Sequence, residues 1–205
     1  MIEQNGFGGK LYDLSEKVMR LAYLNILWIA FTLLGAVILG FFPATVSMFT
    51  VVRKWAMGDS EIPIFKTFWQ TYRKEFLKIN QLGLILVGIG YLLFLDMMFF
   101  KNTVGPTLQP LFYVLLVLFI IYFVVILYIF PVYVHYNFKI IESIKYAFIM
   151  GVGRLFQTAL MILCSIGLYY FFIFIPGLIP FFSGSVLSLT LMSIAKRSFP
   201  QMNDA

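Results

Sequence analysis

The sequence predicts an all-α, polytopic transmembrane helical bundle, and three observations lead to that prediction. Apolar residues make up 61% of the 205 residues and charged residues only 12%, against about 45–50% and about 25% in a typical soluble domain. Several uncharged apolar runs approach the length of about 20 residues that a membrane-crossing helix needs. Lys and Arg gather between these runs, which is typical of cytoplasmic loops. We therefore expect a single membrane domain over residues 1–205.

Four of the apolar runs are long enough to cross a bilayer. Unpaired backbone groups are costly in lipid, so each run is expected to be a helix. The four predicted transmembrane helices are 82–100, 111–134, 155–175 and 177–195.

The region Leu21–Val52 is a fifth apolar run, and it holds 32 residues without a charge. It is long for one crossing and short for two, and Pro43 is expected to break or kink a helix there. One crossing would divide the 15 Lys and Arg residues into 4 and 11, whereas two crossings would divide them into 14 and 1. The second division fits the positive-inside rule better. We therefore expect a hairpin that returns the chain to the side where it started.

The arms of this predicted hairpin are 21–42 and 43–57. The second arm is only about 20 Å long, so we expect it to be a short or re-entrant arm. Together with the four other spans, the hairpin gives six membrane segments and places both termini in the cytoplasm.

Three segments have the pattern of amphipathic helices on the cytoplasmic face: 10–20, 63–81 and 139–150. In 63–81, aromatic residues recur on one face and cations occupy the others, as an interfacial helix requires. One interpretation is a membrane-surface helix without a specific partner. The sharper hypothesis is that it docks a partner subunit, with the candidate contact residues Phe65, Phe68, Trp69, Tyr72, Arg73 and Lys74.

The sequence offers no residue set for catalysis or metal binding. His135 is the only histidine and Cys164 the only cysteine, so neither a Cys/His metal cluster nor a histidine-based triad is expected. There is also no P-loop motif. The net charge of +6 is explained by basic loops, so nucleic acid is not an expected partner. We predict no catalytic residue, no cofactor and no metal.

Asp96 is the one acidic residue inside an apolar run. An intramembrane carboxylate is by default a candidate proton relay or substrate contact, so Asp96 is a candidate intramembrane polar site. It also lies near the end of its run, five residues before Lys101. The alternative is therefore an interfacial carboxylate within reach of a cation or water.

Short motifs of aromatic, proline and basic residues are spread over most of the chain, at Leu24–Trp28, Pro43–Thr45, Val51–Trp55, Phe65–Phe68, Phe130–Pro131, Phe138–Ile140 and Ser143–Phe148. Together they resemble the YesL-like family of bacterial integral membrane proteins, a family labelled as a domain of unknown function. One departure is Phe42, which stands where that family commonly has Gly before the Pro-Ala pair. The nearest glycine on that side is Gly40.

Genes of that family tend to lie beside bacterial ABC importers for oligosaccharides. The resemblance therefore implies a non-enzymatic accessory membrane subunit of a carbohydrate importer in the bacterial inner membrane. Its expected partners are the ABC permease subunits, the ATPase in addition, and the lipid bilayer. The alternative is an autonomous small oligomeric transporter or channel with Asp96 and the Pro43 hairpin near its pathway. A membrane-bound sensor is a third hypothesis.

Overall fold

The computed structural model describes residues 7–103, 109–136 and 138–199. Within these ranges the regular structure is entirely helical, which confirms the predicted all-α fold. In chain order the elements are α1 (Phe7–Leu34), α2 (Ile38–Ala56), α3 (Ile64–Thr103), α4 (Gln109–Tyr136), α5 (Ile140–Gly153), α6 (Leu155–Phe174), the short 3-10 helix η2 (Pro176–Leu178) and α7 (Ile179–Lys196).

The core of the molecule is built around α2, which packs against α1, α3, α4 and α7. Ten of its 19 residues are buried, and they include small side chains such as Ala44 and Ser47. Small residues allow helix backbones to approach closely, which is how membrane helices gain packing energy without water to drive them together. As a result, α2 fixes the relative positions of four other helices.

The predicted hairpin is present, but its turn does not lie at Pro43. α1 ends at Leu34 and α2 begins at Ile38, so Pro43 is inside α2. Proline lacks an N–H, which leaves the carbonyl of residue i−4 without its helical partner. Here that carbonyl belongs to Leu39 and accepts a hydrogen bond from Asn80 Nδ2 of α3 at 3.0 Å. The helix therefore continues through the proline, and the second arm is longer than predicted, at about 28 Å.

The turn itself is made by residues 35–37. Gly35 and Gly40 lie so close that a Cβ on either would overlap backbone atoms of the other. Val37 has φ 65° and ψ −61°, and the N–H of Ile38 donates to the carbonyl of Ala36 at 2.8 Å. This is a classic γ-turn, which is rare and strained for a residue with a side chain. The bare backbones of the two glycines make such an abrupt reversal sterically possible.

Two predicted helix boundaries are also absent. The predicted helix 63–81 and the predicted span 82–100 form one helix, α3, of 40 residues, about 60 Å long. The predicted interfacial helix 10–20 is likewise continuous with the first span in α1. At the expected break in α3 the ring of Phe42 lies against the bare Cα of Gly83. Packing on α2 therefore supports the helix where its amphipathic pattern changes to an apolar one.

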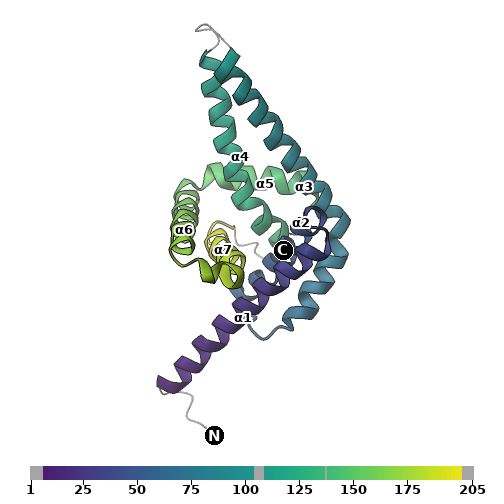
Figure 1. Ribbon diagram of the computed structural model, residues 1–205, viewed down its shortest axis with the longest axis vertical. Helices are drawn as coiled ribbons and strands as arrows, with labels where there is room; N and C mark the ends of the chain where they lie inside the picture. The colour runs from purple at the N-terminus through teal and green to yellow at the C-terminus, as the bar shows by residue number, and fades with distance from the viewer. Residues whose placement is uncertain (1–6, 104–108, 137, 200–205) are drawn as a thin grey trace, which may run out of the picture.

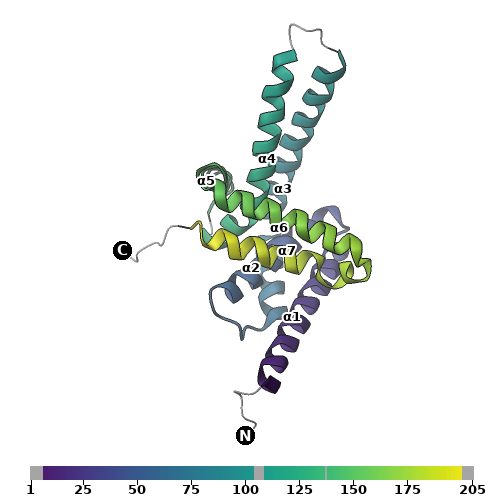
Figure 2. The same ribbon diagram turned by 90° about the vertical axis from the view of Figure 1, so that its left-hand side faces the viewer.

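Figures 1 and 2 show how the helices are arranged. The α3–α4 hairpin projects from the rest of the molecule, with its tip at the opposite end of the long axis from the start of α1. The α6 and α7 pair crosses this hairpin steeply in Figure 2. α5 lies across the base of the hairpin and connects α4 to α6. The helices therefore cross at large angles and do not form a parallel bundle.

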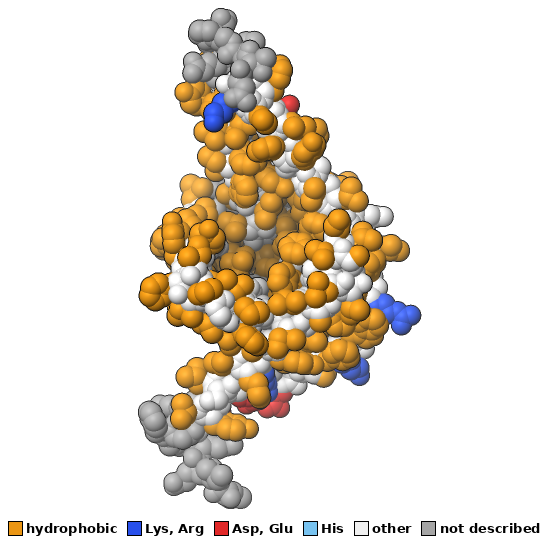
Figure 3. Space-filling view, in the orientation of Figure 1, with side chains coloured by type: hydrophobic (Ala, Val, Ile, Leu, Met, Phe, Trp, Pro, Cys, Tyr) orange, Lys and Arg blue, Asp and Glu red, His pale blue; other side chains and the backbone are white. Residues whose placement is uncertain are grey.

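The outer surface is that of a membrane protein. Among the described residues, five helical stretches are long and apolar enough to cross a membrane, and only 17–33% of each one's most apolar window is buried inside the molecule. Figure 3 shows one face covered almost entirely by hydrophobic side chains, with a hollow near its middle. Water is a poor solvent for such a surface, so the chain is a multi-pass membrane protein. A sixth crossing through α2 stays a prediction.

Candidate functional site

The predicted partner-binding face on α3 is divided between the core and the surface. Phe68 is fully buried and Tyr72 is 7% exposed. Both rings pack on Phe31 of α1, and the Tyr72 hydroxyl donates to the Phe31 carbonyl at 3.1 Å. These two residues attach α3 to α1, so the prediction that they contact a partner is wrong.

The other four candidate residues stay on the surface. Phe65 is 51% and Trp69 42% exposed, and Arg73 and Lys74 are exposed on the next turns. Leu77, 76% exposed, continues the same line. We call these residues, Phe65, Trp69, Arg73, Lys74 and Leu77, the α3 strip. Its spacing of about four residues places them along one side of the helix.

Asp96 is exposed on the distal half of α3. No described cation lies within 4.0 Å of its carboxylate. Phe42, the neighbour of Pro43, packs on Gly83, and 13 residues of helix separate Gly83 from Asp96, about 20 Å. The structure therefore does not bring Asp96 and the Pro43 region into one pathway.

A polar cavity lies among α2, α3 and α4. Its volume is about 440 Å³, and it is lined by Val46, Thr50, Arg53, Gln70, Thr71, Lys74, Glu75, Tyr133, Val134 and His135. These residues meet because the last turns of α2 and α4 pack beside the first half of α3. We take this cavity as the candidate functional site because it concentrates polar side chains in an otherwise apolar molecule.

Glu75 forms one wall of the cavity. It is 9% exposed, and its Oε2 accepts a hydrogen bond from the Tyr133 hydroxyl at 2.6 Å. Lys74 Nζ lies 3.9 Å from Oε1. Lys78 Nζ lies 5.0 Å from the centroid of the Tyr133 ring and donates to the carbonyl of Phe138. This carboxylate therefore has one cation, Lys74, and one hydroxyl donor beside it.

Arg53 and His135 also line the cavity. Arg53 Nε and His135 Nδ1 are both buried, and neither has a hydrogen-bond partner among the described residues. The imidazole ring of His135 stacks on Phe199, with 4.2 Å between ring centroids. Arg53 Nε can only donate, whereas Nδ1 of a neutral imidazole can donate or accept. A buried donor without an acceptor costs free energy, so the partner that Arg53 lacks is an acceptor oxygen.

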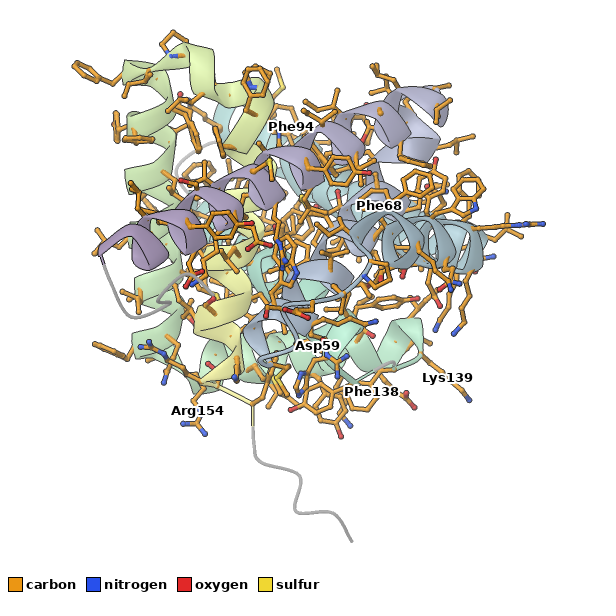
Figure 4. All side chains as sticks on the ribbon, turned by 90° about the horizontal axis from the view of Figure 1, so that it is seen from below. Asp59, Phe68, Phe94, Phe138, Lys139 and Arg154 are labelled. Atoms are coloured by element: carbon orange, nitrogen blue, oxygen red, sulfur yellow. The ribbon has the colours of Figure 1, made fainter. Side chains whose placement is uncertain are left out.

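Cations of α7 and α1 lie beside the end of α2. Lys196 Nζ, at the end of α7, donates to the carbonyl of Ala56 at the end of α2 at 2.7 Å. Arg20 of α1 donates to the carbonyl of Ser60 in the α2–α3 connection. In Figure 4, Asp59, Phe138, Lys139 and Arg154 lie toward one edge of the molecule and Phe94 toward the opposite edge. The cavity therefore opens in the basic region of the protein.

Sequence reasoning did not identify the cavity, although one signal was present. Phe68, Tyr72 and Ile79 are buried apolar positions in the first half of α3, and Glu75 has the same periodicity. An acid on the apolar stripe of a helix indicates a buried polar contact. Arg53 and His135 carry no such signal, because their proximity depends on how α2 and α4 pack. Within the described ranges, no three His, Cys, Asp or Glu side chains are placed to hold a metal ion.

Fold and cavity together define a polytopic α-helical membrane protein with a polar site where α2 and α4 end against α3. Residues 21–97 match the family model described as "Protein of unknown function, DUF624". The chain is 40% identical to YesL of Bacillus subtilis (strain 168), over 91% of this chain and 88% of that protein. It belongs to this YesL-like family, which confirms the resemblance found in its motifs.

Two further relatives come from the same organism. YesV is 37% identical over 92% of this chain and 91% of its own length. YteU is 34% identical over 94% of this chain and 86% of its own length. All three relatives are described as uncharacterized proteins. No solved structure matches the chain.

Proposed function

We propose that the protein is a non-enzymatic accessory subunit of a bacterial ABC importer for carbohydrates or oligosaccharides. The proposal takes the class of partner from the family resemblance in the sequence. The observation that supports a docking role is the α3 strip, where the exposed aromatic residues Phe65 and Trp69 are followed on the next turn by the exposed cations Arg73 and Lys74. Aromatic residues and Arg are enriched at the centres of protein interfaces.

Two surfaces would contribute to the complex. The α3 strip would bind an acidic surface of the permease or its ATPase at the cytoplasmic side, where complementary charge favours association. The projecting α3–α4 hairpin would lie against transmembrane helices of the permease. Its exposed side chains include Leu84, Leu92 and Val117, which are 72%, 61% and 55% exposed.

This function requires a defined orientation in the cell membrane, with both termini in the cytoplasm. The positive-inside rule supports this orientation. Lys196 and Arg20 donate to backbone carbonyls at the end of α2 and in the α2–α3 connection, and Arg53 is in the last turn of α2. Lys101, in contrast, is in the last turn of α3, at the far end of that helix. The α3 strip then belongs to the part of α3 nearest the cytoplasm.

Co-purification tests the proposal. The tagged protein is extracted from membranes of its own host in mild detergent, and the proteins that accompany it are identified and quantified. We expect permease and ATPase subunits of a carbohydrate importer to accompany the wild type. Arg73→Glu should reduce their recovery about tenfold, because a repulsive charge then stands at the interface.

Lys145→Glu is the matched control, since Lys145 is an exposed cation on α5, away from the strip. Its recovery of importer subunits should equal that of the wild type. Wild-type preparations without any importer subunit would refute the proposed function. Equal losses for the two variants would refute the role of the strip.

A further inference from the structure

We propose that the cavity among α2, α3 and α4 is a binding site for a phosphate-bearing molecule, with Arg53 as its main anchor. The phosphate belongs either to the headgroup of a membrane lipid or to a soluble phosphate ester. The observation that carries this inference is Arg53, which lines the cavity and pairs with no carboxylate among the described residues.

The donors exceed the acceptors in this cavity. Arg53 is a donor only, and its Nε is buried without a partner in the described part of the chain. Lys74 and Gln70 add further N–H donors at the rim. The one carboxylate in the lining, that of Glu75, is already occupied by the Tyr133 hydroxyl and by Lys74. A ligand that completes the site must therefore bring acceptor oxygens.

Charge specifies the ligand further. A partly buried guanidinium requires a compensating anion, because an unpaired buried charge is strongly unfavourable. Its planar fork of N–H groups matches the oxygens of a phosphate, which it binds in a bidentate manner. Lys74 supplies a second positive charge at the cavity mouth, where its side chain is 77% exposed. Both cations line the cavity, so the site presents two positive charges to a phosphate.

The size and position of the cavity fit such a ligand. Its volume of about 440 Å³ falls within the range of about 300–1,000 Å³ that is usual for small-molecule sites. It opens near the ends of α2 and α4, among the cations of the basic side. At that position, both the phosphate of a lipid in the adjoining leaflet and a phosphate ester from the aqueous phase can reach the cavity.

Two binding measurements separate the two sources of phosphate. In the first, detergent-purified protein is mixed with phosphatidylglycerol or with diacylglycerol, and retained lipid is counted by native mass spectrometry. In the second, glycerol 3-phosphate or glycerol is titrated in detergent, and the shift in Tm is followed. Diacylglycerol and glycerol lack the phosphate, so they show how much of the binding comes from the rest of the ligand.

Arg53→Gln removes the guanidinium, and Lys54→Gln is the matched control, because Lys54 is its neighbour on α2 but does not line the cavity. Losing a charge-assisted hydrogen bond should weaken binding about tenfold or more. A lipid site predicts retention of phosphatidylglycerol that Arg53→Gln loses and Lys54→Gln keeps. A soluble-ligand site predicts the same difference for the Tm shift caused by glycerol 3-phosphate.

The inference is overturned if Arg53→Gln and Lys54→Gln bind both phosphate compounds alike, or if the wild type binds neither in preference to its neutral control. Should Arg53→Gln fail to fold, Lys74→Gln takes its place, since that exposed side chain is not needed for packing. Lys74→Gln should weaken phosphate binding several-fold, and unchanged binding would then overturn the proposal. Co-purification of importer subunits does not measure phosphate binding. The proposed function and the phosphate site can therefore be refuted independently of each other.

Discussion

Asn25 connects the first helix to the last. It is fully buried in α1, and its Nδ2 donates to the carbonyl of Pro180 at 2.7 Å. Its Oδ1 accepts from the N–H groups of Gly184 and Ser185 of α7 at 2.9 and 3.0 Å. Hydrogen bonds across a helix interface are specific contacts in a medium that has no water to replace them. A single amide therefore sets how α1 and α7 meet.

Asn25→Ala should destabilise the fold, because it removes three hydrogen bonds and leaves a gap. We expect a loss of about 1–3 kcal/mol, seen as a lower Tm in detergent. Gln157→Ala is the control, because Gln157 is a half-buried amide on α6 that makes no side-chain hydrogen bond to a described residue. A Tm for Asn25→Ala no lower than that of the control would contradict this role.

Val37 is a strained residue of the α1–α2 turn. Its φ of 65° and ψ of −61° are unfavourable for a β-branched side chain, and its side chain is 52% exposed, so little packing is lost on removing it. Val37→Gly should therefore raise stability by about 1 kcal/mol. Val117→Gly, at a similarly exposed position inside α4, should lower the Tm instead. A fall in Tm for both variants would contradict the strained turn.

At the scale of the elements, the sequence predicted the apolar spans closely but not how they join. The predicted 111–134 and 155–175 end within two residues of α4 and α6, because uncharged runs of that length have one low-energy conformation in lipid. The predicted position of the α1–α2 turn, at Pro43, was wrong. Proline usually ends a helix, but Asn80, distant in sequence, satisfies the carbonyl that Pro43 leaves free. A tertiary contact of this kind has no local signature.

The close contact of Gly40 with α1 predicts how a substitution there affects the α1–α2 hairpin. A Cβ on Gly40 would meet the carbonyl oxygens of Phe31 and Thr32, so Gly40→Ala should push the α1–α2 hairpin apart and lower the Tm. In contrast, a Cβ on Gly88 would meet nothing within 4 Å, and Gly88→Ala should leave the Tm unchanged or raise it slightly. Equal Tm values for the two alanine variants would argue against the close approach at the hairpin.

At the scale of the whole molecule, composition and charge predicted that the chain lies in a membrane. The cavity among α2, α3 and α4, in contrast, results from three-dimensional packing. Of the six candidate residues on α3, Phe68 and Tyr72 are buried, because helical periodicity alone groups them with their exposed neighbours. Periodicity does not indicate which side of α3 packs against α1. The cavity joins Arg53, Glu75 and His135 from three helices. Only the crossing of those helices brings such residues together, and no pattern in the sequence encodes that crossing directly.

The proposed orientation and docking role require apolar helices that cross a membrane and hold the basic connections on one side. The most direct test replaces Cys164 with Ser, then places single cysteines at Asp59, in the α2–α3 connection, and at Lys101, near the hairpin tip; both positions are exposed. A membrane-impermeant maleimide applied to intact cells should label Lys101→Cys and leave Asp59→Cys unlabelled until the cells are broken. Labelling of Asp59→Cys in intact cells, with Lys101→Cys protected, would contradict the orientation and the docking role built on it.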